Sequence, residues 1–431
     1  MYNIMGKVVV AFAMVWAIWS CNAFADQSVW IGPDGGSWQN ANNWSPKQVP
    51  DNNMIPGVSY SVTIATTQRT RINLQQGVEI NSLVCSGDVD FEHSQPTPIV
   101  ITGTGLVNNG RLEFSGVGPH DVKGSFVNSS GAELQPSNLL NIDGDLTNEG
   151  SIFLLGSSEY TGLDVGEGGV ITNNGKIVIL HSHVVANGFI NGSSGAIEGS
   201  GWIGVGETIQ NQGIISASFG ELSILFAGGG LSNTGTIRNS AGASVLVTHL
   251  FFEGEISNEG MVEVNAGGGV TFDTTVRNKS AGTLKLLDGV LAAPSIIQTK
   301  DAGFSGFGTI TGNIVIEQDG KIQLTGPANV IGTVDIGANA TLEISDGQTL
   351  ITGHTTNNGT IHLKSGGIGR FQGGLTDNGD IIHESGSYYT QEELEHAVGE
   401  VIRKYDPSLD GKVGLEEAIH ALRIVSGIVT Q

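Results

Sequence analysis

The sequence is poor in charged residues, aromatic residues and cysteine. Charged residues make up 14% of its 431 positions and aromatic residues 6%, whereas roughly a quarter of an average globular domain is charged. So little aromatic bulk disfavours a compact enzyme core. There are two cysteines, Cys21 and Cys85. If a leader containing Cys21 is removed, no intramolecular disulfide can form, and the apolar context of Cys85 (Leu83-Val84-Cys85) predicts a core position.

Positively charged residues are less than half as many as negatively charged ones. The chain has 19 Lys and Arg against 42 Asp and Glu, a net charge of −23. Binding to phosphate backbones needs a basic surface, so we expect no nucleic-acid partner and no attraction to anionic membranes. The negative charge favours cations and keeps an exported protein soluble.

The first 25 residues predict a secretory signal peptide. Lys7 precedes an apolar run over 8–19, and Ala23-Phe24-Ala25 fits the small-x-small cleavage pattern. We therefore expect a secreted or cell-surface protein that begins at Asp26. A permanent membrane anchor and lipid attachment at Cys21 stay open as alternatives. No other apolar stretch approaches transmembrane length, so no integral span is expected after cleavage.

Glycine is abundant, with 65 residues, and it recurs in a repeated unit. The unit reads apolar residue, Asn, one or two residues, Gly, and then Ile, Leu or Val shortly after. Copies lie at residues 109–112, 148–152, 174–177, 211–214, 233–237, 258–262, 358–361 and 378–381.

The repeat length predicts a parallel β-solenoid. Asn108, Asn128 and Asn148 lie 20 residues apart, and other intervals run from 18 to 25. Such a repeat holds two or three short strands with alternating apolar residues, and stacked coils bury a continuous core. We expect Asn and Gly at bends with positive φ, with the Asn amides hydrogen-bonded from coil to coil. The alternative, an antiparallel β-sandwich array, would repeat about every 100 residues.

In the part of the chain where the Asn-Gly unit is not recognisable, apolar residues recur with the same 20-residue spacing. Ile314, Ile316, Ile322 and Leu324 return 20 residues later as Val334, Ile336, Leu342 and Ile344.

This repeat style resembles the right-handed β-helices of bacterial surface adhesins, autotransporter-type passengers and filamentous secreted proteins. The resemblance covers most of the chain and implies a right-handed solenoid with a structural or adhesin-like role. The expected organisation is a signal peptide (1–25), an N-terminal tryptophan-rich cap with the first strands (26–94), solenoid repeats (95–386) and a helical hairpin (387–431).

Three of the six tryptophans cluster near the mature N-terminus, at Trp30, Trp38 and Trp44. The segment looks like one often found at this position in bacterial secreted β-helical proteins. One interpretation is a cap that covers the open end of the solenoid. The other is a platform on which sugar rings stack.

The composition changes after Gly386, and a helix–loop–helix is predicted. Thr390 is a candidate N-cap with Glu393 at the capping-box position, and a second amphipathic helix follows residue 417. The loop between them, 406–417, resembles EF-hand and dockerin-type calcium loops. That likeness implies Ca²⁺ as the cofactor and the following ligands: Asp406, Ser408, Asp410, the Lys412 carbonyl and Glu417.

Two departures leave a metal-free hairpin open as an alternative. Ser408 replaces the usual Asp or Asn, and the sequence shows one loop where EF-hands and dockerins usually have two.

No catalytic motif is apparent, so we expect a non-enzymatic protein without catalytic residues. Asp and Glu are scattered singly, as at Asp143 and Asp145, and His181 and His183 would share a strand face as isolated histidines. The first hypothesis is an exported structural or adhesin-like protein with one calcium module. The second is a polysaccharide-binding or polysaccharide-degrading β-helix. The third is an assembly component that docks a surface protein through its C-terminal module.

Overall fold

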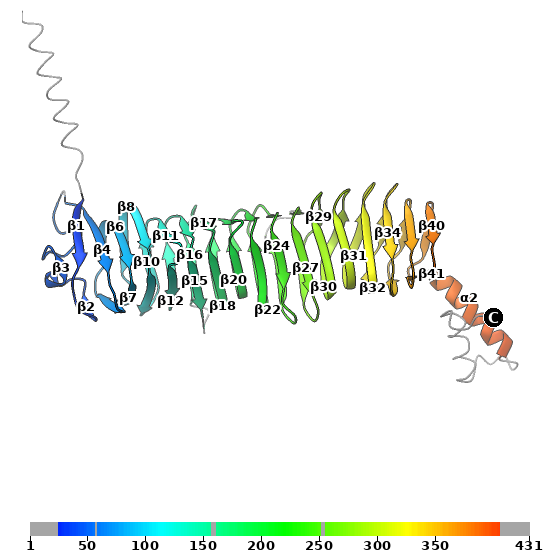
Figure 1. Cartoon of the computed structure of the whole chain (residues 1–431), viewed down its shortest axis with the longest axis horizontal. Helices are drawn as coiled ribbons and strands as arrows, with labels where there is room; N and C mark the ends of the chain where they lie inside the picture. Colours follow the sequence, from blue (N-terminus) through cyan, green and yellow to red (C-terminus); the bar gives the residue numbers. More distant parts are fainter. Residues whose placement is uncertain (1–24, 57, 157–160, 251–254, 406–431) are drawn as a thin grey trace, which may run out of the picture. The chain divides into compact units, whose positions relative to one another are not determined.

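The computed structural model describes residues 25–56, 58–156, 161–250 and 255–405, with the side chains of 401–405 left out. The chain divides into two compact units, residues 1–209 (unit 1) and 210–431 (unit 2). Figure 1 labels many of their strands and the C-terminal helix. The predicted signal peptide, except Ala25, and the predicted calcium loop lie outside the described residues.

Unit 1 consists of short strands joined by tight turns. Its elements are β1 (Asp26–Trp30), β2 (Gly36–Ser37), the 3₁₀ turn η1 (Ala41–Asn43), β3 (Trp44–Ser45), β4 (Tyr60–Ala65), β5 (Thr70–Leu74), β6 (Val78–Ser86), β7 (Asp88–His93), β8 (Pro98–Asn108), β9 (Arg111–Gly116), β10 (His120–Lys123), β11 (Phe126–Asn128), β12 (Glu133–Pro136), β13 (Leu139–Ile142), β14 (Leu146–Asn148), β15 (Ser151–Leu155), β16 (Gly162–Val165), β17 (Val170–Asn173), β18 (Lys176–Ala186), β19 (Gly188–Asn191) and β20 (Ala196–Val205). The division between the units falls within β21 (Ile209–Asn211).

Unit 2 repeats the pattern and adds one α-helix. Its elements are β22 (Ile214–Phe226), β23 (Leu231–Asn233), β24 (Thr236–Asn239), β25 (Ser244–His249), β26 (Ile256–Asn258), β27 (Met261–Asn265), β28 (Gly269–Phe272), β29 (Val276–Asn278), β30 (Thr283–Gln298), β31 (Gly303–Ile316), β32 (Lys321–Ile331), β33 (Val334–Ile336), β34 (Thr341–Ile344), β35 (Gln348–Ile351), β36 (Thr355–Asn357), β37 (Thr360–Leu363), β38 (Ile368–Phe371), β39 (Leu375–Asp377), β40 (Asp380–His383), β41 (Ser387–Thr390) and α2 (Gln391–Tyr405).

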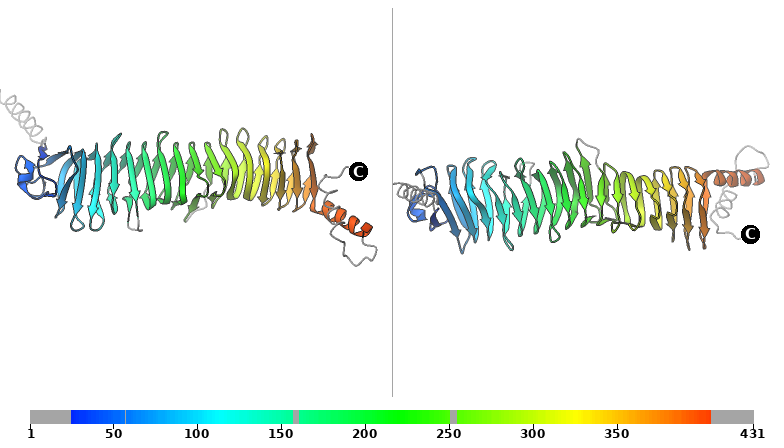
Figure 2. Two further views of the ribbon diagram at one scale, coloured as in Figure 1. Left: turned by 60° about the horizontal axis from the view of Figure 1, so that its bottom comes forward. Right: turned by 90° about the horizontal axis from the view of Figure 1, so that it is seen from above.

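Both units are parallel β-solenoids. In unit 1, strands of successive coils pair in parallel in three ladders. Figure 2 shows the strands of successive coils lying side by side. The first ladder runs β7–β9–β12–β15–β18, the second β10–β13–β16–β18–β20 and the third β8–β11–β14–β17–β19. The predicted fold class is confirmed, and the antiparallel sandwich array is wrong. The right-handed sense stays a prediction.

Alternating side chains build the core of each coil. In the first ladder of unit 1, Leu112, Leu134, Ile152, Ile177 and Ile197 occupy one column, and all of them are buried. Burying such a side chain stabilises the fold by about 1.5–3 kcal/mol. Because each strand contributes only a few inward side chains, each coil completes its core against the coils on either side.

A row of asparagines fixes the spacing between coils. The Nδ2 atoms of Asn108, Asn128, Asn148 and Asn173 each donate to the Oδ1 of the next Asn along the row, which ends in unit 1 at Asn191, over 2.7–2.8 Å. Each Nδ2 also donates to a backbone carbonyl at the start of the first-ladder strand in the following coil, over 2.9–3.4 Å. The predicted amide ladder is thus confirmed, and the side chains are fully buried without leaving their N–H groups unpaired.

The predicted reason for the repeat glycines is wrong. Gly110, Gly175 and Gly235 are absent from the glycines with positive φ, and the row asparagines are likewise absent from the residues with positive φ. A β-carbon at Gly175 would lie 2.0 Å from the carbonyl oxygen of Gly150. Glycine is therefore needed because the backbones of successive coils approach closely at this bend.

Unit 2 confirms the apolar period. Ile314 pairs with Val334, and Ile322 with Leu342, as their 20-residue spacing predicts. Parallel pairing continues to β41, whose residues Ser387–Thr390 lie beyond the solenoid boundary expected at residue 386. No helix in the described parts of the chain is long and apolar enough to cross a membrane.

The start of α2 follows its sequence signals. Glu393 N donates to Thr390 Oγ1 over 3.2 Å, and Thr390 N donates to Glu393 Oε2 over 2.8 Å. This reciprocal capping box confirms Thr390 as the N-cap and Glu393 as its partner.

Replacing one row asparagine should destabilise unit 1. Asn148→Ala removes the acceptor of the Asn128 amide and the donor to Asn173, so we expect a loss of about 1–3 kcal/mol. Urea unfolding followed by circular dichroism measures this loss. Asn109→Ala is the control, since Asn109 is exposed and bonds Ser129 at the surface, and it should change stability by less than about 0.5 kcal/mol. Equal stabilities of the two variants would contradict a structural role for the row.

Candidate functional site

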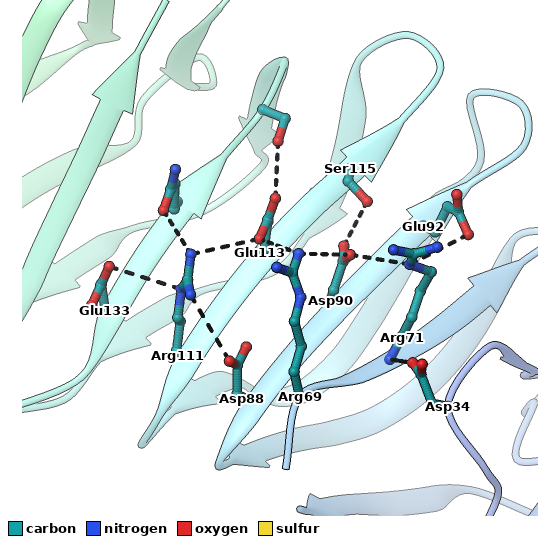
Figure 3. Close-up of polar contacts among 12 residues, drawn as sticks. Asp34, Arg69, Arg71, Asp88, Asp90, Glu92, Arg111, Glu113, Ser115 and Glu133 are labelled. Atoms are coloured by element: carbon teal, nitrogen blue, oxygen red, sulfur yellow. Dashed lines mark hydrogen bonds and ion pairs between the residues drawn. The ribbon is translucent and has the colours of Figure 1, made fainter.

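Charged side chains gather on the outer face of the first ladder in unit 1. We call them the arginine–carboxylate array; the members are Arg69, Arg71, Asp88, Asp90, Glu92, Arg111, Glu113 and Glu133 (Figure 3). Strand alternation turns these residues outward, and stacking brings residues about 20 positions apart to neighbouring strands. Acidic residues that are scattered singly in the sequence are therefore brought together on this face, and sequence distance hides their pairing across coils.

Within the array, acids and arginines neutralise one another. The Asp90 carboxylate is 2% exposed, accepts from Ser115 Oγ at 2.6 Å and lies 3.3 Å from Arg69 Nη2. Glu113 contacts Arg69 at 2.8 Å and Arg111 at 3.8 Å, and Glu113 is the main cause that raises the pKa of the Arg69 guanidinium. Cross-strand pairs of opposite charge stabilise a sheet, so the array is best explained as a structural clamp.

The second ladder of unit 1 carries a different acidic surface, which we call the aspartate groove. It has a volume of about 370 Å³ and is lined by Asp121, Val122, Lys123, Asn141, Ile142, Asp143, Asp164 and Gly166. The Asn141 amide donates to Asp121 Oδ1 over 2.6 Å. Within the described residues, no arginine contacts these aspartates, and neither Lys123 nor Asp143 has a side-chain hydrogen bond or ion pair.

Asp164 links the groove to an exposed tryptophan. Its Oδ1 lies 3.2 Å from Nε2 of His183, which is itself 8% exposed. The His183 ring stacks on Trp202 with centroids 4.8 Å apart and planes inclined by 12°. Trp202 is 38% exposed, whereas Trp30, Trp38 and Trp44 are buried. A polar groove beside a partly exposed, fixed aromatic ring is typical of a binding site for an amphipathic ligand.

Glycines make room for this arrangement. The register aligns Gly162, His183 and Trp202 on successive strands. A β-carbon at Gly162 would lie 2.3 Å from the His183 ring, and one at Gly204 would lie 2.9 Å from Trp202. Any larger residue at position 162 would therefore displace His183 and, with it, the support of the tryptophan ring.

Comparison with known protein families, characterised proteins and solved structures finds no match. Function is therefore inferred from the residues of the chain itself.

The sequence-predicted calcium ligands, Asp406, Ser408, Asp410, Lys412 and Glu417, all lie outside the described residues. Within the described ranges up to residue 405, no group of three or more His, Cys, Asp or Glu side chains is placed to hold a metal ion. The calcium site thus stays a prediction from the loop sequence.

The N-terminal tryptophans do not form a sugar platform. Trp38 and Trp44 are fully buried, Trp30 is 5% exposed, and the indole of Trp44 donates to Trp38 O over 2.7 Å. Trp38 also packs toward Phe91 of β7 with a centroid distance of 6.2 Å. The platform hypothesis is wrong because the rings pack against each other, while a capping role stays a prediction.

Two other sequence expectations have different outcomes. Cys85 is buried, as predicted, and burial raises the pKa of its thiol. His181 and His183 do not share a face, because a bulge between Leu180 and Ser182 interrupts the strand where it passes from one ladder to the next. His181 has a φ of 52° and is exposed, whereas His183 packs under Trp202.

A second pair of histidines lies in the core of unit 1. His93 and His120 are buried with ring centroids 4.4 Å apart. Thr97 Oγ1 lies 3.2 Å from His93 Nδ1, while His93 Nε2 and both nitrogens of His120 have no hydrogen-bond partner in the described parts of the chain. The pKa of each is lowered to about 4, mainly by burial. For His93 the neighbouring His120 adds to the lowering, and the carboxylates of Asp121 and Asp90 oppose it.

This pair should make stability depend on pH. The unfolded chain takes up protons near pH 6.5 and the folded chain near pH 4, so stability is complete above about pH 6.5 and falls as the pH drops toward 4. The loss amounts to about 3 kcal/mol per histidine at most. Urea midpoints measured from pH 7 to pH 4 test this, and His120→Leu should flatten the curve. The exposed His396→Gln should leave it unchanged, and a His120→Leu curve as steep as wild type would refute the assignment.

Proposed function

We propose that this protein is an exported, adhesin-like β-solenoid that binds glycans along the outer face of unit 1. The observation that carries the proposal is the partly exposed Trp202 ring, which stacks on His183 two strands along the ladder from Asp164 of the aspartate groove. A sugar ring has an apolar face of C–H groups and a rim of hydroxyls. The indole face can stack on the C–H groups, and carboxylate and amide side chains on neighbouring coils can hydrogen-bond the hydroxyls.

Binding is favoured over hydrolysis because the closely spaced carboxylates of the array are already paired with arginines. Hydrolases of glycosidic bonds need a pair of carboxylates on either side of the bond, one of them protonated. The Asp90 and Glu113 carboxylates lie in ion pairs with Arg69 at 3.3 and 2.8 Å, so they are not free to flank a glycosidic bond. A polysaccharide-degrading activity remains the second hypothesis for the groove carboxylates, and release of products from a bound glycan distinguishes it from binding.

The cell-surface location, the calcium module and a docking role for the C-terminus belong to the same proposal. They are supported by the leader sequence at 1–25, the likeness to surface β-helices and the loop at 406–417. In this proposal the solenoid spaces the binding face from the cell, and the C-terminal helical hairpin is a calcium-dependent cap or a contact for a surface protein.

Glycan binding is tested by retention of the mature chain, residues 26–431, on insoluble and immobilised polysaccharides. We expect specific retention that Trp202→Ala weakens about tenfold or more, a change of roughly 1.4 kcal/mol. Phe219→Ala is the matched control, because Phe219 is 69% exposed and lies on another strand, β22. Retention on no glycan, or equal losses in both variants, would refute the proposal.

Calcium binding is tested on the same chain by calorimetric titration. We expect one site with a dissociation constant on the order of 0.1–1 mM, as in extracellular modules. Glu417→Gln should abolish the heat because it removes the bidentate ligand, whereas Glu416→Gln, at the adjacent position, should bind normally. If wild type gives no heat at millimolar calcium, the loop is a metal-free turn.

A further inference from the structure

We propose that the aspartate groove selects glycans carrying protonated amino groups, that is, amino-sugar polymers with free amines. The inference deepens the proposed function and rests on it, since it names the class of glycan that the groove would take.

The first observation is the contrast between the two acidic faces of unit 1. On the first ladder, three arginines neutralise the carboxylates of the array. On the second ladder, Asp121, Asp143 and Asp164 line a groove in which Lys123 is the sole lining cation within the described residues. Asp121 bonds a neutral amide, and Asp143 has no ion pair to any described residue. The carboxylates of the array are thus paired with arginines, whereas in the described residues the groove is lined by one lysine and only Asp164 has a basic partner, His183 at 3.2 Å.

The second observation is the spacing of the carboxylates. Asp121, Asn141 and Asp164 are paired on successive strands β10, β13 and β16. Coils lie about 4.8 Å apart, so Asp121 and Asp164 are separated by about 10 Å along the ladder. One small cation cannot bridge that distance, and no described group of acids is placed to hold a metal ion. Amines repeated along an extended polymer can pair with both.

The third observation is an aromatic ring further along the same ladder. Trp202 lies two strands beyond β16 and stacks on His183, whose Nε2 atom is 3.2 Å from Asp164 Oδ1. A flat ring adds stacking on a sugar and attraction for a nearby ammonium group. A basic peptide would satisfy the carboxylates but would gain less from a flat ring. The combination favours an amino sugar over a lysine-rich partner.

The test is calorimetric binding of glucosamine oligomers to residues 26–431, beside their N-acetylated counterparts and polylysine. Free amines should bind at least tenfold tighter than acetylated ones at low salt, and the gap should shrink as salt screens the charges. Asp143→Asn and Asp164→Asn should each reduce the difference in affinity between free-amine and acetylated oligomers. Asp335→Asn, at an exposed position of β33, should leave that difference unchanged. Trp202→Ala should weaken both oligomers, and Trp202→Phe should restore part of the binding.

Two outcomes would overturn the inference while leaving the proposed function in place. Acetylated oligomers could bind as tightly as free amines, or polylysine could bind as tightly as glucosamine oligomers while other glycans still bind through Trp202. A chain that binds no glycan of any kind would instead remove the proposed function itself. Gly162→Ala adds a check on the support of the ring: it should reduce oligomer affinity, whereas Gly188→Ala, where the new β-carbon meets Val170 at ordinary distances of 3.4 and 3.8 Å, should not.

Discussion

The stacking of one coil on the next is the constraint from which the other features follow. Parallel backbone pairing holds neighbouring strands about 4.8 Å apart, and the asparagine row makes that step uniform by joining each amide to its neighbour and to a carbonyl in the following coil. The same step brings backbones so close at the bends that glycine alone fits there. A buried polar row is stable in such an interior because every N–H in it has an acceptor.

This regular step also organises the surface. Two residues on successive strands of one ladder lie next to each other although about 20 positions separate them in the sequence. The charge and polarity of each face therefore depend on which side chains the register places in one column. The array and the aspartate groove are two results of one geometry. Arginines among the carboxylates give the array its ion pairs, whereas Asn141 between Asp121 and Asp164 leaves an open, acidic groove.

Much of the fold could be predicted from the sequence, because its determinants are local and periodic. Coil stacking can be seen in the sequence as a 20-residue spacing. Asn128 and Asn148 are hydrogen-bonded across coils, and Ile314 pairs with Val334. The groove could not be predicted, since Asp121 and Asp164 look isolated in a chain whose coil lengths vary. Once the strand register is known, the outward-facing residues that lie next to each other on successive strands can be identified. The burial of Trp38 and Trp44 was also beyond sequence reasoning, because a tryptophan-rich segment suits a surface platform and a packed core equally well.

The unequal lengths of the coils have a consequence of their own. In unit 1 the row passes from Asn128 to Asn148 in 20 residues, from there to Asn173 in 25, and on to Asn191 in 18, yet its amide contacts stay within 2.7–2.8 Å. The contacts of the interior are therefore the same whatever the length of the loops outside it. The entropic cost of closing a longer loop grows only slowly with its length. Such a scaffold can therefore carry coils of different length, and so different surface loops, on one interior.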